Sequence, residues 1–224
     1  VDHKKFFAAV KATNTTLNDS EGRMGLTRYG TIPMMDITSS FGALPTRNNR
    51  EVQFEGHEQI NVTAMQEPNE RGHTNFIANG ACFGCTIGCG RICHIDPEHF
   101  SVKDRPQYQH ASGGLEYETA YALGAAVGVN DIDAATFAGF MCNEYGMDPI
   151  SLGGTIAAAM ELYDIGVITQ EHTGGLDLAF GNAEVLCQIS EMAGKGEGFG
   201  VDIGLGSKLL CEKYGRPELS MAVK

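Results

Sequence analysis

The amino-acid sequence predicts a mainly α-helical, multihelical domain with an irregular N-terminal third. In residues 113–224, apolar side chains recur at helical spacing between capping residues and glycines. Residues 1–80, by contrast, are rich in Gly, Pro, Asn and Thr and keep no sustained helical period. No internal repeat or low-complexity linker divides the chain. We therefore expect one helical domain with an irregular lead-in (1–80), a cysteine-rich loop region (81–112) and a helical part (113–224).

Little regular structure is expected in the first half. Residues 2–12 should form a short helix, because Asp2 can cap its start and apolar residues lie on one face. From residue 13 to residue 79 we expect loops and short extended pieces, with the best strand candidate at 59–65. Residues 94–114 are polar and broken by two prolines, which predicts a loop.

The second half should contain helices at 116–128, 131–146, 151–166, 182–196 and 207–215. Asp131 is the expected N-cap of the second of these, and Gly146 its C-terminal stop. Ser151 is the expected cap of the third, which should stop at Gly166.

Composition excludes several classes of protein. Of the 224 residues, 42% are hydrophobic and 20% charged, as in ordinary globular proteins. A net charge of −12 argues against a nucleic-acid or anionic-membrane partner. The sequence contains no stretch of 18 apolar residues, so no membrane span is expected, and the first residues do not resemble a signal peptide. Seven cysteines, an odd number with four in one cluster, do not suit an extracellular disulfide framework, so a reducing cytoplasm is expected.

Four cysteines lie within fourteen residues, in the stretch GACFGCTIGCGRIC at 80–93. Cys82, Cys85 and Cys89 form C-x2-C-x3-C, and Cys93 follows after three more residues. These spacings place thiolates on one side of a tight loop or helical turn, where they can share a metal centre. The intervening glycines let backbone N–H groups approach sulfur, which tunes a cluster's potential. The pattern favours an iron–sulfur cluster.

Other metal sites fit the spacing less well. Zinc usually takes two C-x2-C pairs far apart or a C-x2-C pair with two histidines, although His94 and His99 leave a zinc knuckle as an alternative. Radical enzymes that use S-adenosylmethionine have the reverse order, C-x3-C-x2-C. Spacing alone leaves the fourth ligand open between Cys93 and a cysteine elsewhere, inside or outside this chain.

Six stretches of the chain form a specific combination: GALPTRN (42–48), ACFGCTIGCGR (81–91), GGLEYET (113–119), LGAAVGVND (123–131), CNEYGMDPISLGGTIAAAMELY (142–163) and YGRPELSMAVK (214–224). No single piece is specific, but the combination is, and it runs through nearly the whole chain. Taken together, these stretches resemble the aldehyde ferredoxin oxidoreductase family, whose members are tungsten enzymes.

The resemblance implies the middle portion of a larger enzyme. Family members add a β-rich domain before this portion and a second helical domain after it. The implied cofactors are a tungsten (or molybdenum) bis-pterin and one [4Fe–4S] cluster. Cys82, Cys85 and Cys89 would ligate the cluster, the fourth ligand would lie beyond Lys224, and Cys93 would take no part. A piece of 224 residues should then hold neither cofactor by itself.

The segment NEYGMDP (143–149) lies between two expected helices. A carboxylate such as Asp148 suits the N–H donors of a pterin's amino-pyrimidinone edge. The segment resembles the family's first D-x-x-G-L-D pterin motif, which implies cofactor contacts for Asn143, Gly146, Met147 and Asp148. Asn143 departs from the usual Asp, and Met147 from Leu. The alternative is a plain helix–loop–helix connection in which Asp148 only caps a helix.

Two further residues gain a role from the resemblance. In the family, the second Glu of G-x-E-Y-E lies near tungsten, so Glu118 is the candidate proton acceptor or donor, a task that suits a buried carboxylate. Without the resemblance, Glu118 would be a first-turn Glu that favours the helix dipole. Arg91, next to the glycine-rich cysteine loop, should lie on the electron path between metal and cluster.

The expected function is therefore an oxidoreductase. It would convert an aldehyde and water to a carboxylate and pass two electrons through the cluster to ferredoxin or a similar carrier. The alternative is a stand-alone iron–sulfur electron carrier or zinc-binding module with Cys93 as fourth ligand. Relatives on the same scaffold reduce aromatic acyl thioesters or act on sugar phosphates, and the sequence does not choose the substrate or the oligomeric state.

Overall fold

The computed structural model describes residues 2–110 and 113–221 and is mainly α-helical, as predicted. Parts of two expected segments lie outside the described residues: residues 111–112 of the long loop and 222–224 of the last matching stretch. The helices in chain order are α1 (His3–Asn18), α2 (Glu21–Tyr29), α3 (Met34–Ser40), α4 (Val62–Gln66), α5 (Tyr117–Leu123), α6 (Ile132–Tyr145), α7 (Pro149–Asp164), α8 (Gln170–Thr173), α9 (Ala183–Lys195), α10 (Gly200–Ile203) and α11 (Gly206–Lys213).

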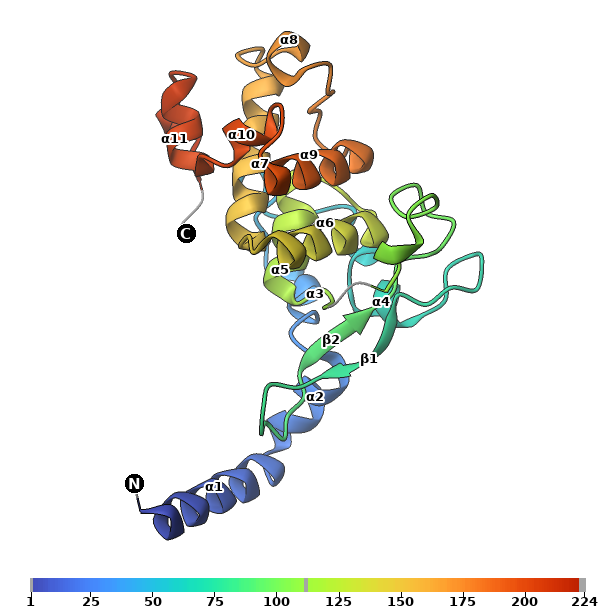
Figure 1. Ribbon diagram of the computed structural model, residues 1–224, viewed down its shortest axis with the longest axis vertical. Helices are drawn as coiled ribbons and strands as arrows, with labels where there is room; N and C mark the ends of the chain where they lie inside the picture. Colours follow the sequence, from blue (N-terminus) through green and yellow to red (C-terminus); the bar gives the residue numbers. More distant parts are fainter. Residues whose placement is uncertain (1, 111–112, 222–224) are drawn as a thin grey trace.

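Helices α5 to α11 form what we call the body, residues 117–213 (Figure 1). Helix α7 runs through it and packs against α5 and α11, while α6 packs along α9. Small side chains allow this close packing: a Cβ on Gly153 of α7 would come within 2.4 Å of the Ala122 carbonyl oxygen on α5. The body therefore contributes most of one continuous core, which also includes buried residues of the preceding segments such as Leu44, Phe54 and Ile95.

The expected helix ends in the body are mostly confirmed. The Asp131 side chain accepts N–H bonds from Asp133 and Ala134 at the start of α6, and Gly146 ends this helix in a left-handed conformation (φ 68°). The expected cap Ser151 is wrong. Helix α7 begins two residues earlier, at Pro149, because the Asp148 carboxylate accepts the Ser151 N–H at 2.8 Å and caps the helix instead.

The N-terminal third is more helical than expected. Helix α1 continues to Asn18, well past residue 12, because the hydroxyls of Thr15 and Thr16 donate to the carbonyls four residues earlier and so compete little with the helix. Asp2 caps its start as predicted. Helices α2 and α3 follow within the segment expected to be irregular.

The expected strand at 59–65 is also wrong. A 3-10 turn at His57–Gln59 leads into α4, and the Asn61 side chain caps this helix by accepting the Ala64 N–H at 3.1 Å. Two unexpected strands, β1 (Phe76–Gly80) and β2 (Gly90–Cys93), instead form an antiparallel hairpin whose connection is the cysteine loop, residues 81–89. Asn79 pairs with Arg91 and Gly80 with Gly90, with a bulge between Phe76 and Ala78.

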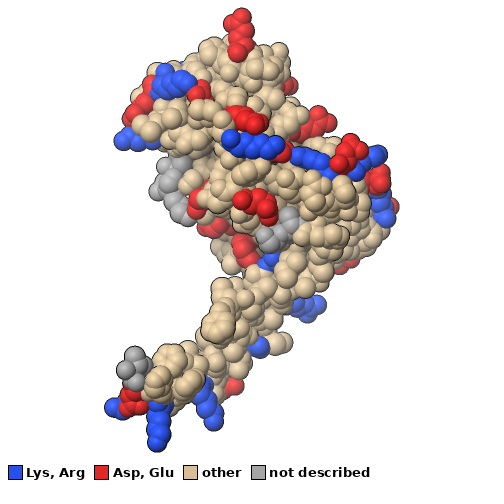
Figure 2. All heavy atoms as spheres, in the orientation of Figure 1, with Lys and Arg blue, Asp and Glu red and all other residues tan. Residues whose placement is uncertain are grey.

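Helices α1 and α2, the hairpin and the cysteine loop form what we call the arm, residues 3–29 and 76–93. Figure 1 shows the arm extending away from the body, with α1 at its far end. No residue of α1 or α2 is buried. Figure 2 shows that the visible face of the arm is largely uncharged between α1 and the body. Within the described ranges, no helix is both long and apolar enough to cross a membrane.

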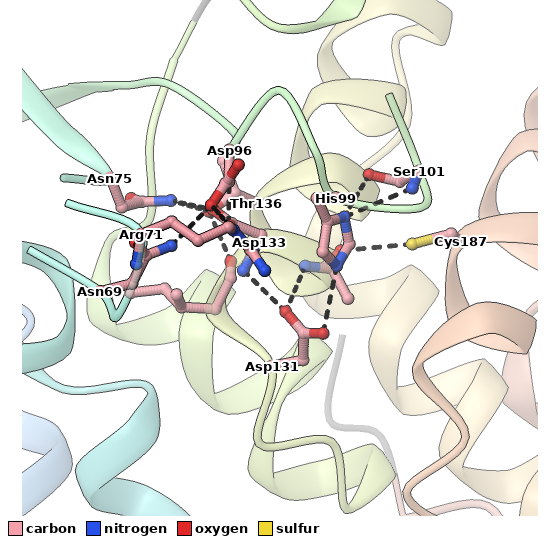
Figure 3. Close-up of polar contacts among 12 residues, drawn as sticks. Asn69, Arg71, Asn75, Asp96, His99, Ser101, Asp131, Asp133, Thr136 and Cys187 are labelled. Atoms are coloured by element: carbon pink, nitrogen blue, oxygen red, sulfur yellow. Dashed lines mark hydrogen bonds and ion pairs between the residues drawn. The ribbon is translucent and has the colours of Figure 1, made fainter. Parts of the chain in front are cut away.

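A buried polar network attaches the segment that follows the hairpin to the body (Figure 3). The Asp96 carboxylate accepts hydrogen bonds from Asn69 and Arg71, both at 2.7 Å. The Asp133 carboxylate at the start of α6 accepts from Asn75 at 2.9 Å and from the Asp96 N–H at 3.3 Å. The expected loop 94–114, which contains one 3-10 turn, is therefore anchored on α6 by side chains rather than by regular structure.

Candidate functional site

The cysteine loop presents three thiols at the tip of the hairpin. Cys82 and Cys85 are exposed and Cys89 is half-buried. The loop makes a tight turn, closed by a hydrogen bond from the Cys85 N–H to the Cys82 carbonyl at 3.0 Å. Two contacts from α2 hold its second half: Arg23 and Thr27 donate to the carbonyls of Thr86 and Ile87.

The loop offers donors and acceptors of the kind that an iron–sulfur cluster uses. Backbone N–H groups of Ile87 and Gly88 lower the pKa of the Cys85 thiol, because they stabilise the thiolate. In the part of the chain that the structure describes, no three His, Cys, Asp or Glu side chains converge on one point. The donor chemistry therefore fits a cluster, and binding would require the loop to draw its three thiols together.

The other four cysteines are all buried. Burial raises the pKa of the Cys93 thiol to about 11 and that of Cys142 to about 12, and it raises those of Cys187 and Cys211 as well. These thiols stay protonated and remain inside the core, which suits structural cysteines rather than metal ligands. The burial of Cys93 in particular does not favour it as the fourth ligand.

The histidines needed for a zinc knuckle are engaged elsewhere. The two ring nitrogens of His99 face Ser101 Oγ at 2.7 Å and Asp131 Oδ2 at 3.1 Å (Figure 3). His94 Nε2 faces His110 Nδ1 at 2.5 Å. These contacts tie the long loop together and direct both rings away from a shared site with the cysteines.

The predicted pterin segment forms the connection from α6 to α7. Asn143 and Gly146 are exposed, Met147 is half-buried and packs against the core, and Asp148 caps α7. Asn143 lies directly over the turn before α5, since its Nδ2 atom is 2.5 Å from where a Cβ on Gly113 would stand.

The predicted acid/base residue lies close to this connection. Glu118 is exposed in the first turn of α5. A small cavity of about 40 Å³ separates the start of α5 from the end of α6 and is lined by Gly114, Thr119, Asn143 and Pro149 among others. The structure thus brings together the GGLEYET and NEYGMDP stretches, which are about thirty residues apart in the sequence.

Arg91, predicted to lie on the electron path, is on β2, which directly follows the cysteine loop. It is buried on β2, its guanidinium donates to the carbonyls of Leu26 and Thr27 on α2, and it also bonds the Asn79 side chain. Burial lowers the pKa of Arg91. Arg91 therefore fastens the hairpin to α2 directly beside the cysteine loop, and its predicted contact with the electron path stays a prediction.

Sequence reasoning gave no role to Glu116 and Thr31. The Thr31 hydroxyl donates to the Glu116 carboxylate at 2.6 Å and accepts the Tyr117 N–H at 2.9 Å, so Thr31 connects the chain before α3 with the start of α5. The two residues are 85 positions apart, and no local pattern points from one to the other.

Comparisons of the sequence with known proteins identify the family of the chain. Residues 8–224 match the sequence profile described as aldehyde ferredoxin oxidoreductase, domains 2 and 3. The tungsten-containing aldehyde ferredoxin oxidoreductase of Pyrococcus furiosus is 37% identical over 226 aligned residues, and that of Thermococcus kodakarensis is 36% identical over 225. Each alignment covers 100% of this chain and 34% of the relative.

A more distant relative is the aliphatic sulfonate oxidoreductase, WOR-like subunit, of Pyrococcus furiosus, 25% identical over 180 residues, with 80% of this chain and 25% of that protein covered. The chain thus spans about a third of the length of the first two relatives. With a profile match across residues 8–224, the chain belongs to the aldehyde ferredoxin oxidoreductase family, as the resemblance predicted.

Proposed function

We propose that the full-length protein oxidises aldehydes to carboxylates at a tungsten (or molybdenum) bis-pterin centre and passes the electrons through a [4Fe–4S] cluster to ferredoxin or a similar carrier. The observation that supports the proposal is the contact of Asn143 with Gly113, because residues 143–149, which we propose to bind the pterin, thereby lie beside the start of α5. The other domains of the same enzyme are the further partners, and a reducing cytoplasm is the proposed location.

Cys82, Cys85 and Cys89 are the proposed cluster ligands. They fit because two are exposed and the third half-buried on one short loop, and because backbone N–H groups already stabilise the Cys85 thiolate. When bound, the two cofactors would supply two-electron chemistry at the metal and one-electron transfer at the cluster. The loop's part is to hold the thiols and to donate N–H groups to sulfur.

Asn143, Gly146, Met147 and Asp148 are the proposed pterin-binding residues. The Asp148 carboxylate accepts the Ser151 N–H as the cap of α7, and a carboxylate can accept several hydrogen bonds at once. Capping and pterin binding are therefore compatible roles. Gly146 ends α6 in a left-handed conformation, which turns the chain so that Met147 and Asp148 follow in the gap between the two helices.

Glu118 is the proposed proton acceptor or donor. The conversion of an aldehyde and water to a carboxylate releases protons together with two electrons, and a carboxylate within reach of the substrate would take up a proton. The side chain is exposed in the described chain, so the rest of the enzyme would have to enclose it to give it the buried setting expected of such a group. Arg91, beside Cys89, is the proposed residue on the electron path.

The first test is an assay of the full-length protein grown with tungstate. We expect tungsten or molybdenum together with about four irons per chain, and reduction of a viologen dye that depends on an aldehyde. The substrate panel should include an aliphatic sulfonate, because one relative is named for that class. A preparation shown to hold tungsten that reduces the dye with none of these substrates would contradict the proposal.

The second test concerns Glu118. We expect Glu118→Gln to lower kcat strongly while metal content stays unchanged, because the amide cannot take up a proton. Glu184→Gln is the matched control: Glu184 is an exposed Glu in the first turn of α9 and shares only the favourable interaction with the helix dipole. Equal activity losses in both variants would show that Glu118 acts only on its helix.

A third test separates the enzyme from a stand-alone electron carrier. Cys93→Ala should leave the iron content of the full-length protein unchanged, since Cys93 is buried and its thiol is held protonated. Loss of the cluster in this variant, with the fold retained, would favour the carrier instead.

A further inference from the structure

Two charged side chains, the buried Arg91 and the half-buried Glu116, each keep one buried polar atom without a hydrogen-bond partner in the described part of the chain. Arg91 is 3% exposed. Within the described part of the chain, its Nε atom and the Oε1 atom of Glu116 are both buried and unpartnered. A buried polar atom without a partner is costly, so a donor and an acceptor left over in one region call for a joint explanation.

The dipeptide Gly30–Thr31 contacts both Arg91 and Glu116. A Cβ on Gly30 would stand 2.6 Å from Arg91 Nε, and the backbone there has a φ of 62°, so only glycine fits. The next residue, Thr31, donates its hydroxyl to Glu116 Oε2 at 2.6 Å and its N–H at 3.4 Å. Guanidinium and carboxylate therefore lie against adjacent residues of one turn.

The two groups also interact through their charges. Among the charged side chains, Glu116 acts most strongly on the Arg91 guanidinium and raises its pKa, against the larger lowering of that pKa by burial. Arg91 follows Cys89 by two residues and Glu116 precedes Glu118 by two. The pair is thus placed between the cysteine loop and the helix that carries Glu118.

We propose that Arg91 and Glu116 form a charge pair, bridged by water between the buried atoms Nε and Oε1, that positions the start of α5 and tunes the reduction potential of a cluster bound by the cysteine loop. A water suits this place because it can accept from Nε and donate to Oε1 at once. The inference rests on the proposed function, since it concerns the cluster. Glu116 acts here as a positioning residue, not as a catalytic residue.

The direction of the effect follows from the charges. A reduced cluster carries one more negative charge than an oxidised one, and a nearby carboxylate disfavours it. Removal of the Glu116 charge should therefore favour the reduced state, and removal of the Arg91 charge should favour the oxidised state. Arg91 is buried and Glu116 half-buried, so salt should screen the effect less than it screens exposed charges.

The test is a redox titration of the full-length holoenzyme, followed by the paramagnetic resonance signal of the reduced cluster. In Glu116→Gln, whose amide oxygen can still accept from Thr31, we expect the reduced-to-oxidised ratio at a fixed potential to rise about tenfold, which is 59 mV for a one-electron couple. Glu116→Asp keeps the charge and should stay within about twofold of the wild type. Glu67→Gln, which removes an exposed carboxylate, should also stay within about twofold.

An unchanged potential in Glu116→Gln would overturn the inference, and so would equal shifts in Glu116→Gln and Glu116→Asp, because the role would then be steric. If Glu116→Gln does not retain the cluster, Arg91→Gln carries the test, with an expected fall of about tenfold in the same ratio. Loss of the cluster in both, with Glu116→Asp intact, would mean that the pair builds the site and does not tune it. A wild-type protein without iron would contradict the proposed function instead.

Discussion

The arm and the body are stabilised in different ways. Nine of the sixteen residues of α7 in the body are buried, whereas none is buried in α1, a helix of the same length in the arm. The body contributes most of the buried core, while the arm depends largely on caps and on hydrogen bonds such as those from α2 to the cysteine loop. The proposed cluster ligands thus lie on the part of the chain with the least internal support.

The largest expected effect is in the core of the body. Phe137 on α6 is fully buried, where it contacts Tyr108 edge-on and lies under the Arg105 guanidinium. Phe137→Ala should lower the free energy of unfolding by about 3–5 kcal/mol through lost burial and a new cavity. Urea unfolding of the chain, followed by circular dichroism, measures this.

The matched control removes the same ring from the surface. Phe41 is 81% exposed, so Phe41→Ala should change the free energy of unfolding by less than about 0.5 kcal/mol. Similar losses of unfolding free energy in the two variants would mean that Phe137 is not part of a packed core.

The same difference explains what the sequence predicted well. Helices α6 and α9 are each predictable from one short segment of sequence. In both, a capping residue, Asp131 or Asn182, is followed by apolar residues at helical spacing and then by a glycine. Where the stabilising contacts are local in sequence, a pattern can find them. The position of the cysteine loop was predictable for the same reason.

The arm was predicted poorly because its contacts are not local. The Thr27 hydroxyl of α2 donates to the carbonyl of Ile87, sixty residues away. The sequence of α2, with its internal glycines, does not indicate this partner. The hairpin was missed because β1 is short and mostly exposed, with no clean alternation. Glu116 was overlooked for a related reason, since its partner Thr31 precedes it by 85 residues.

The second prediction tests the junction between arm and body in acid. Burial acts to raise the pKa of Asp96, but hydrogen bonds from the Glu98 N–H, Asn69 and Arg71 outweigh it and lower the pKa from 3.8 to about 2. Because the folded-state pKa lies below the unfolded value, this carboxylate stabilises the fold above about pH 4, and the contribution is lost as the pH falls towards 2.

We therefore expect Asp96 to account for about 2 kcal/mol of the fall in unfolding free energy between about pH 5 and pH 2. Asp96→Asn should lack this part of the pH dependence, whereas Glu98→Gln, at an exposed position, should keep it. Urea unfolding at several pH values measures the slope, and parallel slopes for wild type and Asp96→Asn would contradict the assignment.

The third prediction concerns the cap of α7 and is smaller. Asp148→Ala should lower the free energy of unfolding by about 1 kcal/mol, because the Ser151 N–H loses its acceptor. Asn caps as well as Asp, so Asp148→Asn should cost only a few tenths. If Asn costs as much as Ala, the charge and not the cap stabilises the helix. In the full-length protein, Asp148→Asn with normal stability but low pterin content would isolate the proposed cofactor contact.

The smallest effect in this chain is expected at the far end of the arm. Phe7 of α1 is 65% exposed, so Phe7→Ala should change the free energy of unfolding by less than about 0.5 kcal/mol, as should Thr13→Ala on another face. A helix of sixteen residues without tertiary packing is only marginally stable in water, so amide hydrogens of α1 should exchange faster than those of α7.

In the full-length enzyme the same change sharpens the comparison. If the remaining domains cover the apolar side of α1, Phe7→Ala should speed hydrogen exchange in α1, and Thr13→Ala should not. Equal exchange of α1 in wild type and Phe7→Ala would mean that this side of the arm stays uncovered. The arm would then have to hold the cysteine loop by the α2 contacts alone.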